Sequence, residues 1–173
     1  MSSLLALSVS IGVLGAIATM LFLHFGLLIW AAFIAWACFF QTGGNTAALR
    51  STIVCNIFGA FLAWVAAIAI VASPLSSALS VPVWAGIMVG LTVLVLCLAS
   101  QVPALSSIPA SVYGYAAVFA YLLQTPDAMS LPRLLSATMA NAFVLVAISM
   151  VIGAFFGLAS GKMAGALTAK ATA

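Results

Sequence analysis

The residues most able to bind a ligand gather in one short polar segment. Gln41, Thr42 and Asn45 offer amide and hydroxyl groups, and Gly43 and Gly44 lie between them. Adjacent glycines let a solute approach the backbone closely. Thr42 or Asn45 can cap a following helix, whose free N–H groups favour an anion or a carbonyl oxygen. The segment is interpreted either as a buried binding element or as an ordinary exposed turn.

Further polar residues stand inside apolar runs. Arg50 either faces a water-filled cavity, where it attracts negative charge, or extends toward lipid headgroups. Asn56 and Asn141 each lie deep in an apolar run, where an amide either bonds across helices or lines a pathway. We expect Asn56 to face one internal cavity together with residues 41–45.

Aromatic residues flank the same polar positions. Trp30 and Trp36 precede Gln41, and Tyr113 precedes Gln124 in a similar run. These rings either line a constriction, with Gln124 as a second polar contact, or belong to packing and interfacial belts.

Composition decides what surrounds these residues. Of 173 residues, 67% are hydrophobic and 3% are charged, whereas soluble domains carry about 25% charged residues. The solvent for most of the surface must therefore be lipid. No basic stripe suggests nucleic acid, and no catalytic triad, carboxylate pair, phosphate loop or metal-ligand spacing is present. We expect no enzyme activity, no cofactor and no metal.

The apolar runs predict the elements that position the candidate site. We expect an all-α, polytopic transmembrane bundle of about six helices in a single domain, residues 1–173. The predicted helices cover about residues 4–23, 27–40, 47–72, 82–98, 110–123 and 133–160, followed by a short tail at 161–173. The second and fifth are too short to cross a hydrocarbon core of about 30 Å unaided.

The two halves of the chain resemble each other. Trp30 and Gln41 match Tyr113 and Gln124 at one offset, and Asn56 matches Asn141 at a slightly larger one. Repeats of three helices each, about residues 4–72 and 82–160, would be inverted in the membrane. Inverted repeats are a common architecture of transporters, with the site at the repeat interface.

Small residues predict close helix packing in two places. The last predicted helix carries Gly153, Gly157 and Gly161 at a spacing of four, and Gly86 and Gly90 give a shorter pattern. The pattern leaves open whether the partner helix is in the same chain or in a homo-oligomer.

The cations predict an orientation. Six spans would bring Arg50, Lys162 and Lys170 to the side of both termini, and Arg133 to the other. Because cytoplasmic loops are enriched in Lys and Arg, we expect cytoplasmic termini.

The apolar helix at 30–40, the Gly43–Gly44 step with Arg50 shortly after it, and the Asn-Ile-Phe-Gly sequence at 56–59 carry a family resemblance. The chain resembles the YcdZ-like family of small bacterial inner-membrane proteins, a domain of unknown function. The resemblance implies a bacterial inner membrane and about six helices, and it implies no substrate.

Two functions fit these observations. The first is a channel or transporter for a small neutral or anionic solute. The second is a non-transporting structural or regulatory subunit that packs against a partner through its glycine-rich last helix. A continuous polar path through Gln41, Asn56 and Asn141 would favour the first, and a dry packed centre the second.

Overall fold

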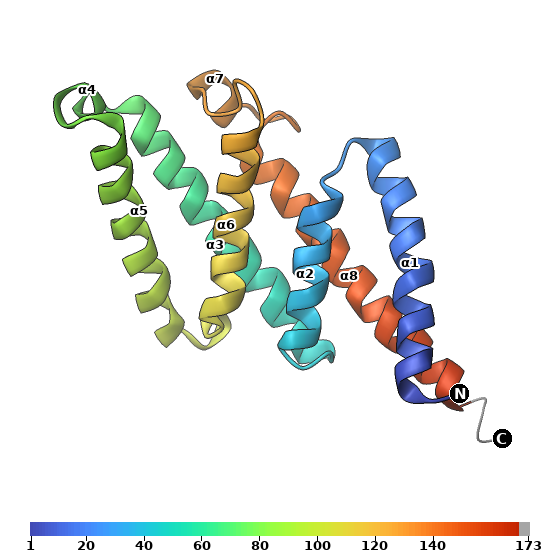
Figure 1. The fold of residues 1–173 in the computed structure, drawn as a ribbon. Helices are drawn as coiled ribbons and strands as arrows, with labels where there is room; N and C mark the ends of the chain where they lie inside the picture. The colour runs from blue at the N-terminus through green and yellow to red at the C-terminus, as the bar shows by residue number, and fades with distance from the viewer. Residues whose placement is uncertain (170–173) are drawn as a thin grey trace.

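The computed structural model describes residues 1–169 and, within that part, consists of helices and turns without strands. Long helices run up and down side by side across the molecule (Figure 1). Their bounds are α1 Ser3–Phe25, α2 Ile29–Gln41, α3 Thr46–Ala72, α5 Val81–Leu98, α6 Ile108–Gln124 and α8 Ala142–Ala169. Short helices lie in the connections: α4 Leu75–Leu79, η1 Ala99–Gln101, η2 Pro103–Leu105 and α7 Leu131–Leu134.

Local chemistry fixes several helix ends. The Ser2 hydroxyl accepts from the Leu5 N–H at the start of α1, and Gly26 ends that helix with a left-handed φ of 67°. Pro82 and Pro109 lie in the first turns of α5 and α6, where the N–H that proline lacks would have no hydrogen-bond partner within the helix.

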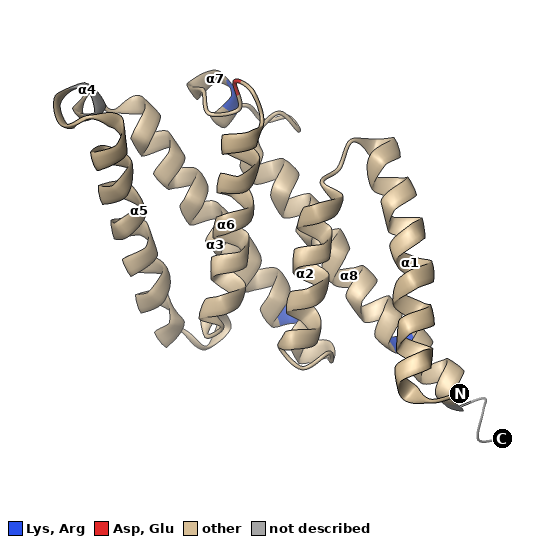
Figure 2. Ribbon diagram, viewed as in Figure 1, with Lys and Arg blue, Asp and Glu red and all other residues tan. Residues whose placement is uncertain are grey.

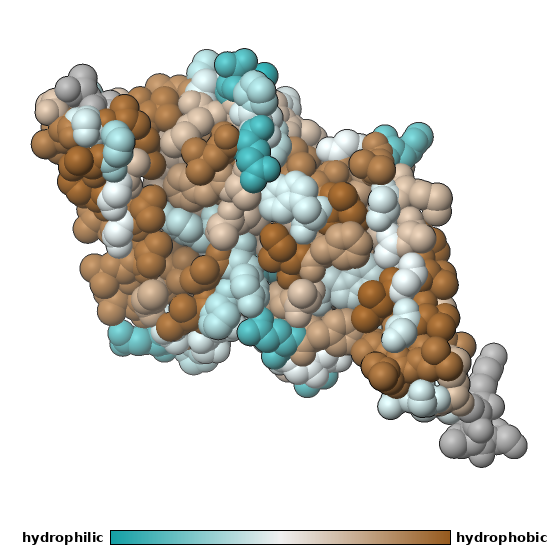
Figure 3. All heavy atoms as spheres, in the orientation of Figure 1, coloured by the Kyte–Doolittle hydropathy of each residue, from teal (hydrophilic) through white to brown (hydrophobic). Residues whose placement is uncertain are grey.

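Among the described residues, four helices are long and apolar enough to cross a membrane: Ser3–Phe25, Thr46–Ala72, Val81–Gln101 and Ala142–Thr168. The shorter α2 and α6, of 13 and 17 residues, lie among them. Large apolar side chains such as Leu4, Leu23 and Leu123 are exposed. Hydrophobic residues cover most of the face in Figure 3, and the most hydrophilic ones gather toward its two ends. This surface suits a lipid bilayer, as composition predicted.

The buried core lies between the tilted long helices and the short ones. Its main cluster joins α3, α6 and α8, with members such as Ala60, Val118 and Val146. A second cluster joins α1, α2 and α8 around Phe22 and Trp36. Helix α5 packs chiefly on α3, and α1 chiefly on α8, so these two are the outer helices.

The last helix differs from its prediction at both ends. It starts at Ala142 rather than near 133, because Leu131–Leu134 form the separate helix α7, with Pro132 in its first turn, and a turn follows that helix. The Asn141 amide holds that turn by donating 2.9 Å hydrogen bonds to the carbonyls of Leu134 and Ser136. Helix α8 then continues to Ala169, so most of the predicted tail at 161–173 is helical.

The predicted pairing of Asn56 with Asn141 is wrong. Asn56 lies well inside α3, whereas Asn141 directly precedes α8. The pairing of Gln41 with Gln124 is different, because each glutamine is the last residue of a short helix.

Candidate functional site

The closest helix contact within the described residues is the crossing of α3 and α6. A methyl group in place of the hydrogen at Gly59 would overlap the backbone carbonyl of Ser111. One at Gly114 would overlap the backbone of Asn56. The two glycines therefore bring the α3 and α6 backbones into direct contact, as small residues do in membrane bundles.

This crossing contains polar groups that have no partner. Asn56 and Ser111 are each 1% exposed, and neither the amide nitrogen and oxygen of Asn56 nor the Ser111 hydroxyl has a hydrogen-bond partner in the described part of the chain. Leaving such a group unpaired typically costs about 1–3 kcal/mol. An amide and a hydroxyl together supply donors and acceptors without charge, which suits water or a small polar solute.

An open pocket adjoins the crossing where α3 begins. It has a volume of about 360 Å³ and is lined by Ala47, Arg50, Ser51, Pro103, Ala104 and Ser106. Cys55, the residue before Asn56, contributes a thiol 3.7 Å from the Ala104 carbonyl. The Cys55 thiol therefore contacts the pocket-lining Ala104, and the lining residue of α3 nearest in sequence to Asn56 is Ser51.

The segment at 41–45 uses its polar groups to hold a turn. The Gln41 side-chain oxygen accepts a 2.6 Å hydrogen bond from the Tyr113 hydroxyl, and the Asn45 oxygen caps α3 through the Ala48 N–H at 2.9 Å. The Thr42 hydroxyl donates to the Cys38 carbonyl at 2.9 Å.

The two glycines of that segment serve the backbone. Gly43 and Gly44 have φ angles of 118° and 64°, a region that favours glycine. Their conformational freedom lets α2 reverse into α3 within a few residues, and this explains them without a bound solute.

The expected shared cavity does not form in the structure. Gln41 and Asn45 are exposed at the end of the bundle, whereas Asn56 is sealed between helices. The three residues therefore do not line one space. The continuous polar path through Gln41, Asn56 and Asn141 is also not formed, since Asn141 is occupied by the turn after α7.

The aromatic candidates lie in separate surroundings. Trp36 is buried, stacks on Phe156 and donates a 3.0 Å hydrogen bond to the Ser160 hydroxyl of α8. Trp30 packs half-buried against the main core, and Gln124 is exposed at the end of α6. They do not surround a common constriction with Tyr113.

The glycines of α8 face α2. A methyl group at Gly153 would overlap the Ala32 backbone, and one at Gly157 would lie 2.9 Å from the Phe39 ring. Gly161 has looser contact, 3.9 Å from Phe40. Gly86 and Gly90 on α5 have no atom within 4 Å of an added methyl group among the described residues.

Sequence reasoning did not place Gly59 and Gly114 in the site, and it did not bring Ser111 together with Asn56. Gly59 stood in the motif at 56–59, and Gly114 is flanked by two tyrosines. A glycine near a polar residue inside an apolar helix is the signal that could have found them. It does not reveal which helices cross.

A family model for proteins of unknown function, DUF1097, matches residues 8–165. The chain belongs to the DUF1097 family. This match confirms membership of a family of unknown function, while the YcdZ-like name and a bacterial origin stay predictions. Comparisons with the curated proteins and with the solved structures each found no match.

Proposed function

We propose that six helices cross the membrane as two inverted repeats, α1–α2–α3 and α5–α6–α8. In such a repeat, α1 corresponds to α5, α2 to α6 and α3 to α8. Under this correspondence the α3–α6 contact becomes the α2–α8 contact, and the α1–α8 contact becomes the α3–α5 contact. All four contacts are present. The corresponding helices run in opposite directions in Figure 1. A bundle with this internal correspondence fits an inverted repeat.

The repeat needs a register different from the one predicted from sequence. Asn45 and Asn141 correspond, because each precedes its long helix and accepts a hydrogen bond from a backbone N–H at the start, that of Ala48 or Phe143. Gln41 and Gln124 correspond at the ends of the short helices. The connection from α6 to α8, which contains α7, is longer than the connection from α2 to α3. A constant sequence offset between the two halves therefore does not hold across it.

Within this architecture we infer a channel or transporter for a small neutral or anionic solute. The unpaired Asn56 amide and Ser111 hydroxyl carry the inference. They belong to α3 and α6, so they sit where the two proposed repeats touch. Transporter sites recur at that interface, and unpaired polar groups in a membrane mark pathways.

The alternative is a structural or regulatory subunit that docks through the last helix, and the absence of a polar path through Gln41, Asn56 and Asn141 favours it. Its docking face argues against it. Gly153 and Gly157, the centre of the face it would use, already pack against α2 of the same chain. A dry bundle also leaves the two unpaired groups at the α3–α6 crossing without a role.

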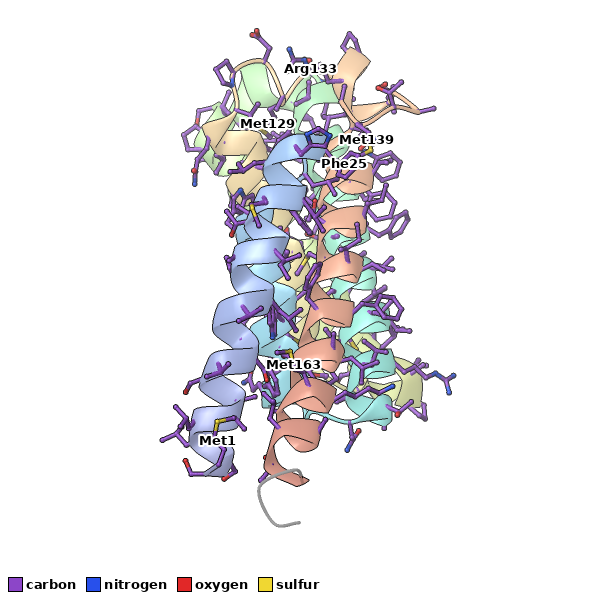
Figure 4. All side chains as sticks on the ribbon, turned by 90° about the vertical axis from the view of Figure 1, so that its right-hand side faces the viewer. Met1, Phe25, Met129, Arg133, Met139 and Met163 are labelled. Atoms are coloured by element: carbon purple, nitrogen blue, oxygen red, sulfur yellow. The ribbon has the colours of Figure 1, made fainter. Side chains whose placement is uncertain are left out.

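We propose a bacterial inner membrane with cytoplasmic termini. Arg50 and Lys162 lie in the parts of α3 and α8 near the end that holds the start of α1, and blue cations mark that end in Figure 2. Arg133 lies at the opposite end with Phe25, away from Met1 and Met163 (Figure 4). Lys170 lies outside the described residues. A C-terminal reporter active only in the periplasm would overturn this orientation.

The test of transport is stopped-flow light scattering from proteoliposomes over a panel of small neutral and anionic solutes. We expect at least one solute to enter faster than in protein-free vesicles. Equal rates for every solute, with folded protein present in the vesicles, would contradict the proposal.

A further inference from the structure

The pocket beside Arg50 is large enough for a small compound. Its volume of about 360 Å³ lies at the lower end of the range for ligand sites, roughly 300–1,000 Å³. One wall is the beginning of α3, with Ala47, Arg50 and Ser51. The other lining residues are Pro103 and Ala104 of η2 and Ser106, in the link to α6.

The charge at this pocket is positive and lacks an acidic side chain. The one acidic residue of the chain, Asp127, lies in the segment between α6 and α7, and α7 is at the end opposite the start of α3 (Figure 2). Arg50 is exposed toward the pocket it lines. An anion entering from this end therefore meets a guanidinium that no carboxylate neutralises.

The neighbouring groups also suit an anion. Ser51 of α3 and Ser106, in the link between η2 and α6, also line the pocket and carry hydroxyl groups. Helices α3 and α6 both begin at this end, so the positive ends of two helix dipoles lie beside the pocket. A guanidinium can bind two oxygens of a carboxylate or phosphate at once.

We propose that this pocket binds the oxyanion of a small carboxylate or phosphate compound, through Arg50 with Ser51 and Ser106. The same chemistry is offered by a free anion and by the phosphate of a lipid headgroup at the membrane surface. This inference rests on the proposed function only where it treats the pocket as the place at which a transported solute would first bind.

Binding is tested on the full chain in nanodiscs of neutral lipid, with inorganic phosphate and acetate titrated by isothermal calorimetry. A second set of nanodiscs contains phosphatidylglycerol, and native mass spectrometry counts the retained anionic lipid. Arg50→Gln is the test variant. Arg133→Gln is the matched control, because it removes the other arginine, whose side chain binds the Pro126 carbonyl at the opposite end.

We expect saturable binding that Arg50→Gln weakens roughly 10- to 100-fold, the loss of a hydrogen bond to a charged group, and that Arg133→Gln leaves unchanged. Binding of phosphate or acetate identifies a free anion, and retention of phosphatidylglycerol alone identifies a headgroup. Binding of neither, or equal loss in both variants, overturns the site. Solute flux that persists in Arg50→Gln would then show that the transport proposal survives without it.

Discussion

The α3–α6 and α2–α8 crossings solve the same packing problem and differ in their polar groups. In both, a glycine lets two backbones touch, Gly59 at Ser111 and Gly153 at Ala32. At α2–α8 the polar groups are paired: Ser149 accepts from the Leu28 N–H at 3.1 Å, and Ser160 accepts from Trp36. At α3–α6, Asn56 and Ser111 are unpaired within the described chain.

Under the transport proposal, this difference distinguishes a crossing that only holds the fold from one that also contacts the solute. Paired polar groups in a membrane hold helices in one arrangement. Unpaired ones weaken the packed state and are retained where a solute or water supplies the missing partner in another state. Two regions with similar packing can therefore be told apart by where their hydrogen bonds go.

The largest effect should come from filling the glycine contacts that both crossings share. Gly59→Val and Gly153→Val should each destabilise the fold by about 3 kcal/mol or more, because the new side chain meets backbone that cannot yield locally. Thermal unfolding followed by size-exclusion in detergent measures this loss. Gly90→Val is the matched control, since nothing lies near it on α5, and an equal loss there would refute the packing argument.

A smaller effect is expected at the paired crossing alone. Ser160→Ala removes the partner of the Trp36 indole N–H. The free energy of unfolding should fall by about 0.6 kcal/mol, the average for hydrogen bonds between membrane helices, and by no more than about 1.7 kcal/mol. Reversible unfolding in mixed micelles measures it. An increase in stability would show that this bond does not hold the α2–α8 crossing.

The smallest effect, and of opposite sign, is expected at the unpaired crossing. Asn56→Leu replaces an unsatisfied amide with an apolar group of similar size, so stability should stay the same or rise by up to about 1 kcal/mol. The same unfolding assay applies. A loss larger than that from Ser160→Ala would mean that Asn56 is a structural residue, and the contrast between the crossings would collapse.

Much of the helical framework could be predicted from sequence because long apolar runs bounded by polar breaks allow few alternatives. The start of α8 could not be predicted, because the residues between Arg133 and Asn141 are nearly as apolar as those of the helix that follows. The turn there is formed by the hydrogen bonds of Asn141 together with those of the Ser136 and Thr138 hydroxyls. The predicted pairing of Asn56 with Asn141 was wrong for the same reason, because the turn was assigned to the helix and the connection was taken to be too short.

The site was less predictable than the framework. Asn56 and Arg50 were found because polar residues are rare in this chain. Residues 41–45 were given a ligand role because composition cannot show that their groups bond to Tyr113, Cys38 and Ala48. The juxtaposition of Ser111 with Asn56 could not be predicted because it depends on which helix crosses α3, and that is set by tertiary packing.

The most direct test of transport through the α3–α6 crossing is solute flux in proteoliposomes made with matched amounts of folded wild type, Asn56→Leu and Ser160→Ala. For any solute that the wild type conducts, Asn56→Leu should reduce the protein-dependent rate at least tenfold, while Ser160→Ala should keep it within about twofold, since tenfold corresponds to about 1.4 kcal/mol. Wild-type flux in Asn56→Leu, or an equal loss in both variants, would contradict the account.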